Sequence, residues 1–373
     1  MLTFQPGVPQ LMRDSNTARN APLGKFKETG DIMEDSYSKS SIYALLYAFY
    51  ASIGTVKSDK GVPYEFTFNT WGVAPTPGFP DDDPQRFGKA AYAGLAQTPA
   101  VSAYITARHG TGHLPSPLGK GLKIVEVGSG TGAGAHLIAG DLLPGAHYTA
   151  LDMQAQGTAT CQRRHGAGVV DGTSGKANVT CVHVPKGVGP GSPIIDGRGK
   201  RVASGSVDIV IICETHIAAT QIGPEEEAIF AEIHRVLAPG GLFIWGNALP
   251  TYVWNAAPAF VTGRGFSLVL NENVTKGAII ARDLDAPRVN AFWDAWSDSM
   301  LVSKIFGTTS LCGRTLEMLV KNFYRHPGTA LYNTMVTGHD SYCRHVYKKK
   351  GPGHHVAKGA GGKGKGKGSG RRG

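Results

Sequence analysis

The chain has 373 residues, of which 41% are hydrophobic, and this is enough apolar material for a sizeable core in one large domain or two small ones. Its formal net charge is +10, but residues 348–373 contain seven Lys, two Arg and no acid, which leaves only +1 for residues 1–347. A groove that follows a nucleic-acid backbone needs its cations on the folded body. Weak contact with nucleic acid or an anionic membrane is therefore expected only of the basic tail.

The five cysteines are Cys161, Cys181, Cys213, Cys312 and Cys343. Their number is odd and no two form a C-x-x-C pair, which argues against a disulfide framework and against a structural zinc site. We therefore expect no metal and a reducing compartment. Residues 1–27 contain no apolar signal-peptide core, and no stretch approaches the roughly 20 apolar residues that span a bilayer. The composition predicts a soluble, cytoplasmic protein.

The N-terminal part of the chain is predicted to hold a leader and a lid. Residues 1–36 are rich in Pro, Asn, Gly and charge, which is typical of a flexible segment. Apolar residues recur at helical spacing in residues 38–53, an aromatic-rich stretch follows at 64–73, and residues 85–95 are predicted to form another helix. We interpret residues 37–117 as a helical and aromatic lid.

The centre, residues 118–250, alternates short β-branched runs with helical segments. Strands are predicted at residues 123–127, 148–152, 179–184, 207–212 and 242–245, and helices at 134–142, 157–165 and 225–237. This alternation predicts an α/β fold with a Rossmann-like, doubly wound sheet. Two later strands, at 266–270 and 342–347, would make the sheet seven-stranded and mainly parallel.

Residues 251–347 are predicted to form substrate-roof helices and the final strands. Helices are expected at residues 291–303 and 315–324, and their apolar residues favour a hydrophobic small molecule, although core packing explains them equally well. These apolar residues include Phe292, Trp296, Met300, Leu301 and Phe306. Residues 348–373 form a Gly/Lys repeat that is predicted to be disordered.

A glycine-rich loop follows the first of the central strands. Residues 125–132 read V-E-V-G-S-G-T-G, and glycines at 128, 130 and 132 let the backbone approach a ligand closely. A dinucleotide site normally reads G-x-G-x-x-G. Glu126, two residues before Gly128, can meet the cationic amino group of a methionine moiety but would repel a pyrophosphate. The loop therefore favours S-adenosylmethionine (SAM) over NAD.

Asp152 closes the second strand about 20 residues later, where a carboxylate can accept both ribose hydroxyls. The alternative is that Gly128, Gly130 and Gly132 form only a tight turn and that Asp152 only starts a helix. The residues predicted to bind the cofactor are Glu126, Gly128, Ser129, Gly130, Gly132, Asp152, Met153 and Cys213.

Four landmarks in order resemble those of class I SAM-dependent methyltransferases: residues 126–132, 151–152, 207–212 and 234–241. More narrowly, the stretches 148–165, 68–72 and 333–347 are similar to the phthiotriol/phenolphthiocerol dimycocerosate-type enzymes, which are related to the sterol and ubiquinone methyltransferases. The chain departs from this group after the third strand. Residues 182–186 lack the acid that contacts the adenine in the group, and Asp196, in the insertion 187–204, is not assigned that role.

The resemblance implies methyl transfer to a small, hydrophobic, lipid-, polyketide- or aromatic-type acceptor, most often at oxygen. His216, just past the fourth strand, is the candidate general base, and Glu214 is a weaker candidate. Phe68, Asn69 and Trp71 are candidates for a lid over the acceptor, or for anchors of the N-terminal helices. The alternatives are a sterol- or quinone-type C-methyltransferase, a nucleic-acid methyltransferase and a SAM-binding protein without activity. The oligomeric state is left open.

Overall fold

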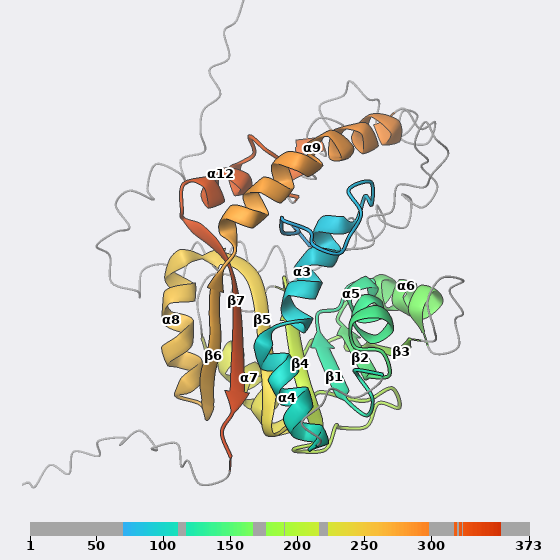
Figure 1. The fold of residues 1–373 in the computed structure, drawn as a ribbon, viewed down its shortest axis with the longest axis vertical. Helices are drawn as coiled ribbons and strands as arrows, with labels where there is room; N and C mark the ends of the chain where they lie inside the picture. Colours follow the sequence, from blue (N-terminus) through green and yellow to red (C-terminus); the bar gives the residue numbers. More distant parts are fainter. Residues whose placement is uncertain are drawn as a thin grey trace, which may run out of the picture. The chain divides into compact units, whose positions relative to one another are not determined.

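The computed structural model of the chain describes residues 70–110, 117–166, 177–189, 191–215, 223–297, 317–318, 321–322 and 324–351 (Figure 1). All of these belong to one unit, residues 52–373. The predicted leader, the helix at 38–53, Phe68, Asn69, His216 and the tail beyond residue 351 lie outside the described residues.

One seven-stranded sheet forms the centre of this unit, in the order β3-β2-β1-β4-β5-β7-β6. The strands are β1 (Lys123–Val127), β2 (His147–Asp152), β3 (Asn178–His183), β4 (Val207–Cys213), β5 (Leu237–Pro250), β6 (Phe266–Asn273) and β7 (Asp340–Lys349). The strands from β3 to β5 pair in parallel, and β7 runs antiparallel to both β5 and β6. The predicted Rossmann-like, mainly parallel, seven-stranded sheet is confirmed.

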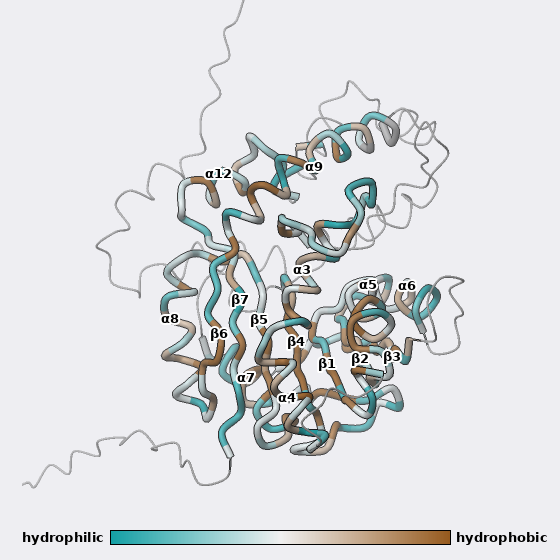
Figure 2. Tube along the Cα trace, in the orientation of Figure 1, coloured by the Kyte–Doolittle hydropathy of each residue, from teal (hydrophilic) through white to brown (hydrophobic). Residues whose placement is uncertain are grey.

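The central strands are largely apolar because both faces of the sheet are covered. In β4 all seven residues are buried, as expected for a parallel strand with helices on both sides. Figure 2 shows the same feature as hydrophobic colour along β1 and β4. Both strands end at the edge where the glycine-rich loop and Glu214 lie.

The described helices are α3 (Arg86–Ala96), α4 (Pro99–His109), α5 (Ala133–Leu137) with the π-helical turn η5 (Ile138–Leu142), α6 (Ala155–His165), α7 (Pro224–Val236), α8 (Thr251–Thr262), α9 (Thr275–Ser297) and α12 (Ala330–Val336). Helices α7 and α8 contribute Phe230 and Trp254 to one core layer, against Trp245 of β5. Helices α3, α4, α5 and α6 cover the opposite face, where Tyr92 packs in a second layer. The sheet is therefore enclosed between two apolar layers.

Helix α9 begins 16 residues before the helix predicted at 291–303. Its buried positions include Ala278, Ala281, Arg282 and Asp285, so the inward face carries small and charged side chains. This face has helical spacing but little apolar signal, which is why the hydrophobic pattern did not reveal it. Among the described helices, none combines the length and the apolar character that crossing a bilayer requires.

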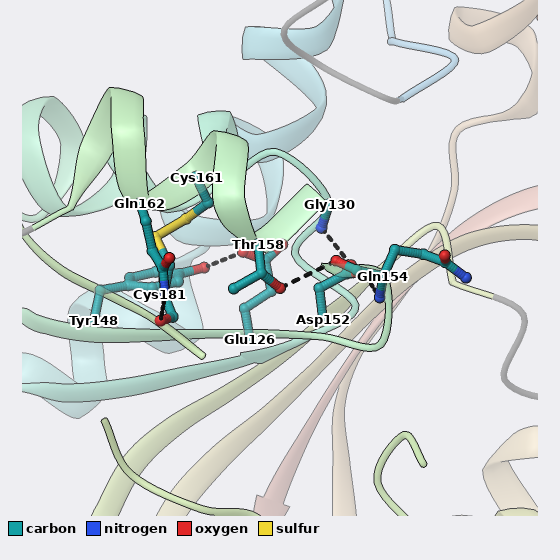
Figure 3. The surroundings of a disulfide bond; sticks show 9 residues. All are labelled: Glu126, Gly130, Tyr148, Asp152, Gln154, Thr158, Cys161, Gln162 and Cys181. Carbon is teal, nitrogen blue, oxygen red and sulfur yellow. Dashed lines mark hydrogen bonds between the residues drawn. A yellow bond between two sulfur atoms is a disulfide. The ribbon is translucent and has the colours of Figure 1, made fainter. Parts of the chain in front are cut away.

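A disulfide joins Cys161 of α6 to Cys181 of β3, with a Cα–Cα distance of 6.0 Å (Figure 3). This corrects the expectation that the cysteines stay unpaired. The cysteine spacing carried no sign of the pair, because a helix and the following strand bring together residues that are 20 positions apart. Since disulfides persist in oxidising environments, the pair also weighs against the reducing compartment inferred from the odd cysteine count.

Removing this disulfide is expected to destabilise the fold. A cross-link that closes a loop of this length contributes about 3 kcal/mol to the free energy of unfolding through the unfolded chain. The double variant Cys161→Ser/Cys181→Ser should therefore unfold at a lower denaturant concentration than the oxidised wild type, and reduced wild type should match the variant. Equal midpoints for oxidised wild type and variant would show that the bond does not constrain the chain.

Candidate functional site

The glycine-rich loop is fastened to the end of the neighbouring strand. The backbone N–H groups of Gly128 and Ser129 donate to the Leu151 carbonyl oxygen at 2.8 and 2.9 Å. Gly132 then takes a left-handed conformation, φ +80°, immediately before α5. These bonds place the loop beside the carboxyl ends of β1 and β2, the edge at which open α/β sheets bind their ligands.

The loop also touches the segment that follows β4. A Cβ added to Gly128 would collide with Cγ2 of Thr215, and one added to Gly132 would collide with Sγ of Cys161. The Thr215 hydroxyl is buried and has no hydrogen-bond partner within the described part of the chain. Glycines at positions 128, 130 and 132 beside an unpaired hydroxyl fit a closely bound polar ligand, as SAM is.

Asp152 is buried at the end of β2, and both of its carboxylate oxygens are held by backbone groups. Gly130 N–H donates to Oδ2 and Gln154 N–H donates to Oδ1, each at 2.7 Å (Figure 3). Burial raises the pKa of Asp152 to about 6, although these two bonds and the charge of His183 lower it. The carboxylate thus links the glycine loop to the start of α6, the position predicted to meet the ribose.

The Glu126 carboxylate is engaged by two tyrosine side chains of the protein. Its side chain is fully buried, and it accepts hydrogen bonds from the hydroxyls of Tyr92 at 2.9 Å and Tyr148 at 3.0 Å. Burial raises its pKa to about 7, while the two tyrosine bonds lower it. Glu126 therefore ties α3 and β2 together beneath the loop, and direct contact with the amino group of SAM stays a prediction.

Glu214 follows β4 directly and has an unusual backbone, φ +49°, in the left-handed region that non-glycine residues rarely occupy. The backbone N–H of Trp71 donates to both carboxylate oxygens at 3.1 and 2.9 Å, and the Tyr342 hydroxyl donates to one of them at 2.5 Å. Burial raises the pKa of Glu214 to about 7, against the lowering effect of these bonds and of the charges of Arg282 and Arg325. Backbone strain of this kind is typical of functional sites.

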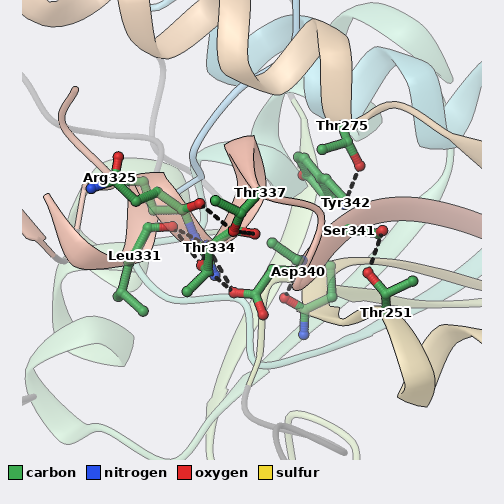
Figure 4. A network of polar contacts seen from close by, with 12 residues as sticks. Thr251, Thr275, Arg325, Leu331, Thr334, Thr337, Asp340, Ser341 and Tyr342 are labelled. Carbon is green, nitrogen blue, oxygen red and sulfur yellow. Dashed lines mark hydrogen bonds and ion pairs between the residues drawn. The ribbon is translucent and has the colours of Figure 1, made fainter. Parts of the chain in front are cut away.

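Two buried arginines, Arg282 and Arg325, lie near Glu214. Arg325 lies over the Trp71 ring, 4.2 Å from its centroid, and pairs with Asp340 at 3.0 Å. Figure 4 shows Arg325 and Asp340 in one polar network near Tyr342, whose backbone N–H donates to the Thr275 hydroxyl at 2.8 Å. The residues around Glu214 thus come from the segment before α3, from α9, from the segment before α12 and from β7. None of these four segments belongs to the cofactor loop.

The remaining predicted residues divide between the surface and the core. Met153 is 45% exposed after β2, whereas Ser129 and Cys213 are buried. The Cys213 side chain lies in the apolar layer beneath α3, so its predicted role at the cofactor stays a prediction. Asp196 accepts the N–H groups of Arg198 and Lys200 within its own turn.

Sequence reasoning missed six polar residues of the site: Tyr92, Tyr148, Thr215, Arg282, Arg325 and Tyr342. Tyr148 carried a usable signal, because it lies one residue into a buried strand where a tyrosine hydroxyl needs a partner. Arg282 and Tyr342 carried none, since their significance comes from elements brought together by the fold.

Residues 125–245 match the family described as methyltransferase domain. The match covers β1 to β5 and includes the glycine loop, Asp152 and Glu214. It confirms the class I SAM-dependent methyltransferase interpretation for this part of the chain and supports SAM as the cofactor.

Two curated relatives match part of the chain. The fatty-acid O-methyltransferase of Mycolicibacterium smegmatis is 29% identical over 133 residues, covering 36% of this chain and 39% of the relative. Phthiotriol/phenolphthiotriol dimycocerosates methyltransferase 1 of Mycobacterium ulcerans is 30% identical over 131 residues, covering 35% and 39%. The match thus spans about two fifths of the length of each relative.

Among solved structures, the cyclopropane synthase MmaA2 of Mycobacterium tuberculosis is 12% identical, with a TM-score of 0.46, and the match covers 77% of this chain and 95% of that one. A geranyl diphosphate methyltransferase in complex with SAM is 13% identical, with a TM-score of 0.41 and coverages of 75% and 98%.

Proposed function

We propose that the protein transfers the methyl group of SAM to an oxygen atom of a small, hydrophobic acceptor. The observation that carries this proposal is Glu214, a carboxylate with a raised pKa in a strained loop, one residue from the Thr215 side chain that lies against Gly128. A hydroxyl acceptor must lose a proton as it is methylated, and a base whose pKa lies near the working pH accepts that proton best.

The residues that would hold SAM are the backbone of Gly128 to Gly132, the carboxylate of Asp152 and the hydroxyl of Thr215. When bound, SAM supplies a methyl group on a sulfonium that is already a strong donor. The tasks left to the chain are to orient the acceptor, to exclude water and to accept a proton. Glu214 is placed for the last task, and His216, two residues further on, remains the other candidate base.

The relatives support a lipid-like acceptor, because the names of both refer to lipids: one is a fatty-acid O-methyltransferase and the other a dimycocerosate methyltransferase. An acceptor that is methylated at carbon, of the sterol or quinone type, is the alternative. A base beside the acceptor serves both reactions, so the methylated atom must be identified by experiment.

The proposal is tested by incubating the full chain with SAM labelled in its methyl group and with dodecanol, 4-octylphenol, dodecanoate, a sterol or a menaquinone. We expect the label to enter the organic extract as an ether or ester, and the Asp152→Ala variant to transfer much less label when SAM is below saturation. Label bound to carbon would favour the alternative. Label that stays with SAM for every acceptor, or enters only added RNA or DNA, would contradict the proposal.

A further inference from the structure

Arg282 is a buried cation with few partners. Its side chain is 4% exposed, and its contact with Asp285, 3.5 Å away, is the one ion pair it makes within the described ranges. Its Nε atom is buried and has no hydrogen-bond partner in that part of the chain. Burying a charge is unfavourable unless it is paired and hydrogen-bonded, so this guanidinium is suited to bind an anion or a strong acceptor.

Asp285 does not supply what Arg282 lacks, because its carboxylate is engaged by another arginine. Arg288 donates to both oxygens of Asp285, from Nε and from Nη2, each at 2.6 Å. This two-pronged pair has the geometry of a strong arginine–carboxylate contact. The guanidinium of Arg282 therefore retains unused donors.

The guanidinium of Arg282 lies near Glu214, and the atom on this side is Nη2, the same atom that contacts Asp285. A Cβ added to Gly72 would stand 3.1 Å from Nη2 of Arg282, and the preceding residue, Trp71, donates its N–H to both oxygens of Glu214. The two side chains influence each other's pKa through their charges, but they form no direct ion pair within 4 Å. The Glu214 carboxylate and the Arg282 guanidinium therefore lie close together without a direct contact.

We propose that the acceptor oxygen binds between Glu214 and Arg282, and that Arg282 stabilises the negative charge that develops on this oxygen. A hydroxyl fits this place, because its oxygen accepts from the guanidinium while its proton points to the carboxylate. A carboxylate acceptor fits less well, since it would face the charge of Glu214. This inference rests on the proposed function and narrows its acceptor class to alcohols and phenols.

The methyl transfer is a simple substitution at the methyl carbon. The acceptor O–H bond breaks and its proton goes to the Glu214 carboxylate, while the oxygen lone pair forms a bond to the methyl carbon. The carbon–sulfur bond breaks with its electron pair left on sulfur, which yields S-adenosylhomocysteine. A donor fixed where charge develops is among the largest contributions that a protein makes to such a step.

A chromogenic phenol, 2-nitro-4-octylphenol, tests the inference in the presence of S-adenosylhomocysteine, without turnover. Absorbance against pH gives the phenolate-to-phenol ratio of the bound probe. Because a cation within about 4–6 Å shifts a pKa by 1–3 units, we expect that ratio at fixed pH to fall at least tenfold in Arg282→Gln. Arg282→Lys should recover part of it. The control Arg264→Gln, whose arginine follows α8 and pairs with Glu227 of α7, should match wild type.

Melting temperatures of the variants separate this role from a structural one. If Arg282→Gln melts like wild type and binds the probe with an unchanged phenolate ratio, Arg282 does not face the acceptor oxygen. Failure of wild type to bind the probe would also overturn the inference. Either result is distinct from failure of the proposed function, which is judged separately by transfer of the labelled methyl group to the acceptor panel.

Discussion

Alanine at position 128 is expected to reduce the affinity of the protein for SAM by roughly 10²-fold or more, because displacing a binding loop by about 1 Å has effects of that size. Gly128 has φ +80°, and a Cβ there would collide with the Thr215 side chain. Either the Thr215 side chain or the loop must then shift, and a shift of the loop breaks the bonds from Gly128 and Ser129 to the Leu151 carbonyl oxygen.

Gly121→Ala is the matched control for this variant. Gly121 has a similar backbone, φ +74°, but a Cβ there would meet no atom within 4 Å. Both variants carry a similar strain of about 1–2 kcal/mol for a side chain in the left-handed region, so both should melt below wild type, and Gly128→Ala lower still because of its collision with Thr215. Calorimetry should show that only Gly128→Ala loses the cofactor. Equal affinities in the two variants would remove the loop from the binding site.

The second large effect is expected from Glu214→Gln, which should lower kcat by roughly 10²–10⁴-fold, the usual contribution of a positioned base. The amide keeps an oxygen that accepts from the Trp71 N–H and the Tyr342 hydroxyl. SAM affinity and fold should therefore change little. The wild-type rate should rise as the pH passes about 7, the raised pKa of Glu214, since the base acts when it is deprotonated.

The same raised pKa has an effect on stability with a defined sign. The folded protein holds the Glu214 proton more tightly than the unfolded chain does, so the free energy of unfolding decreases as the pH rises from about 4.5 to about 7. Glu214→Gln should lack this part of the decrease.

His216→Ala provides the comparison for catalysis. A large loss of kcat in His216→Ala, with the kcat of Glu214→Gln near that of wild type, would make His216 the base.

The central strands and the cofactor loop were predictable because their signals are local. Strand β4 is a buried run that is apolar except for Asp208, and the loop has its glycines at fixed spacing. Glu126 shows that a local motif does not determine which groups a side chain contacts in the folded protein. Its position in the motif suggested a ligand contact, yet strand alternation places it on the same face as Ile124, within the layer beneath α3. Its partners Tyr92 and Tyr148 could not be known without the packing of that layer.

The acceptor side was predictable only in outline. Trp71 and Glu214 were both candidates, but nothing in the sequence indicated that the backbone of one holds the carboxylate of the other across 143 positions. Arg282 and Tyr342 have ordinary sequence surroundings and reach the site through α9 and β7. The disulfide escaped prediction for the same reason, because its two cysteines meet only when α6 packs on β3.

The central claim is that SAM binds at the glycine loop and Asp152. A calorimetric titration of S-adenosylhomocysteine into the full chain tests this binding site most directly. We expect one molecule bound per chain, with Asp152→Ala at least about 10-fold weaker, since hydrogen bonds to a charged group contribute about 1.5–3 kcal/mol. A wild type that binds nothing, or a folded Asp152→Ala that binds with unchanged affinity, would contradict the claim.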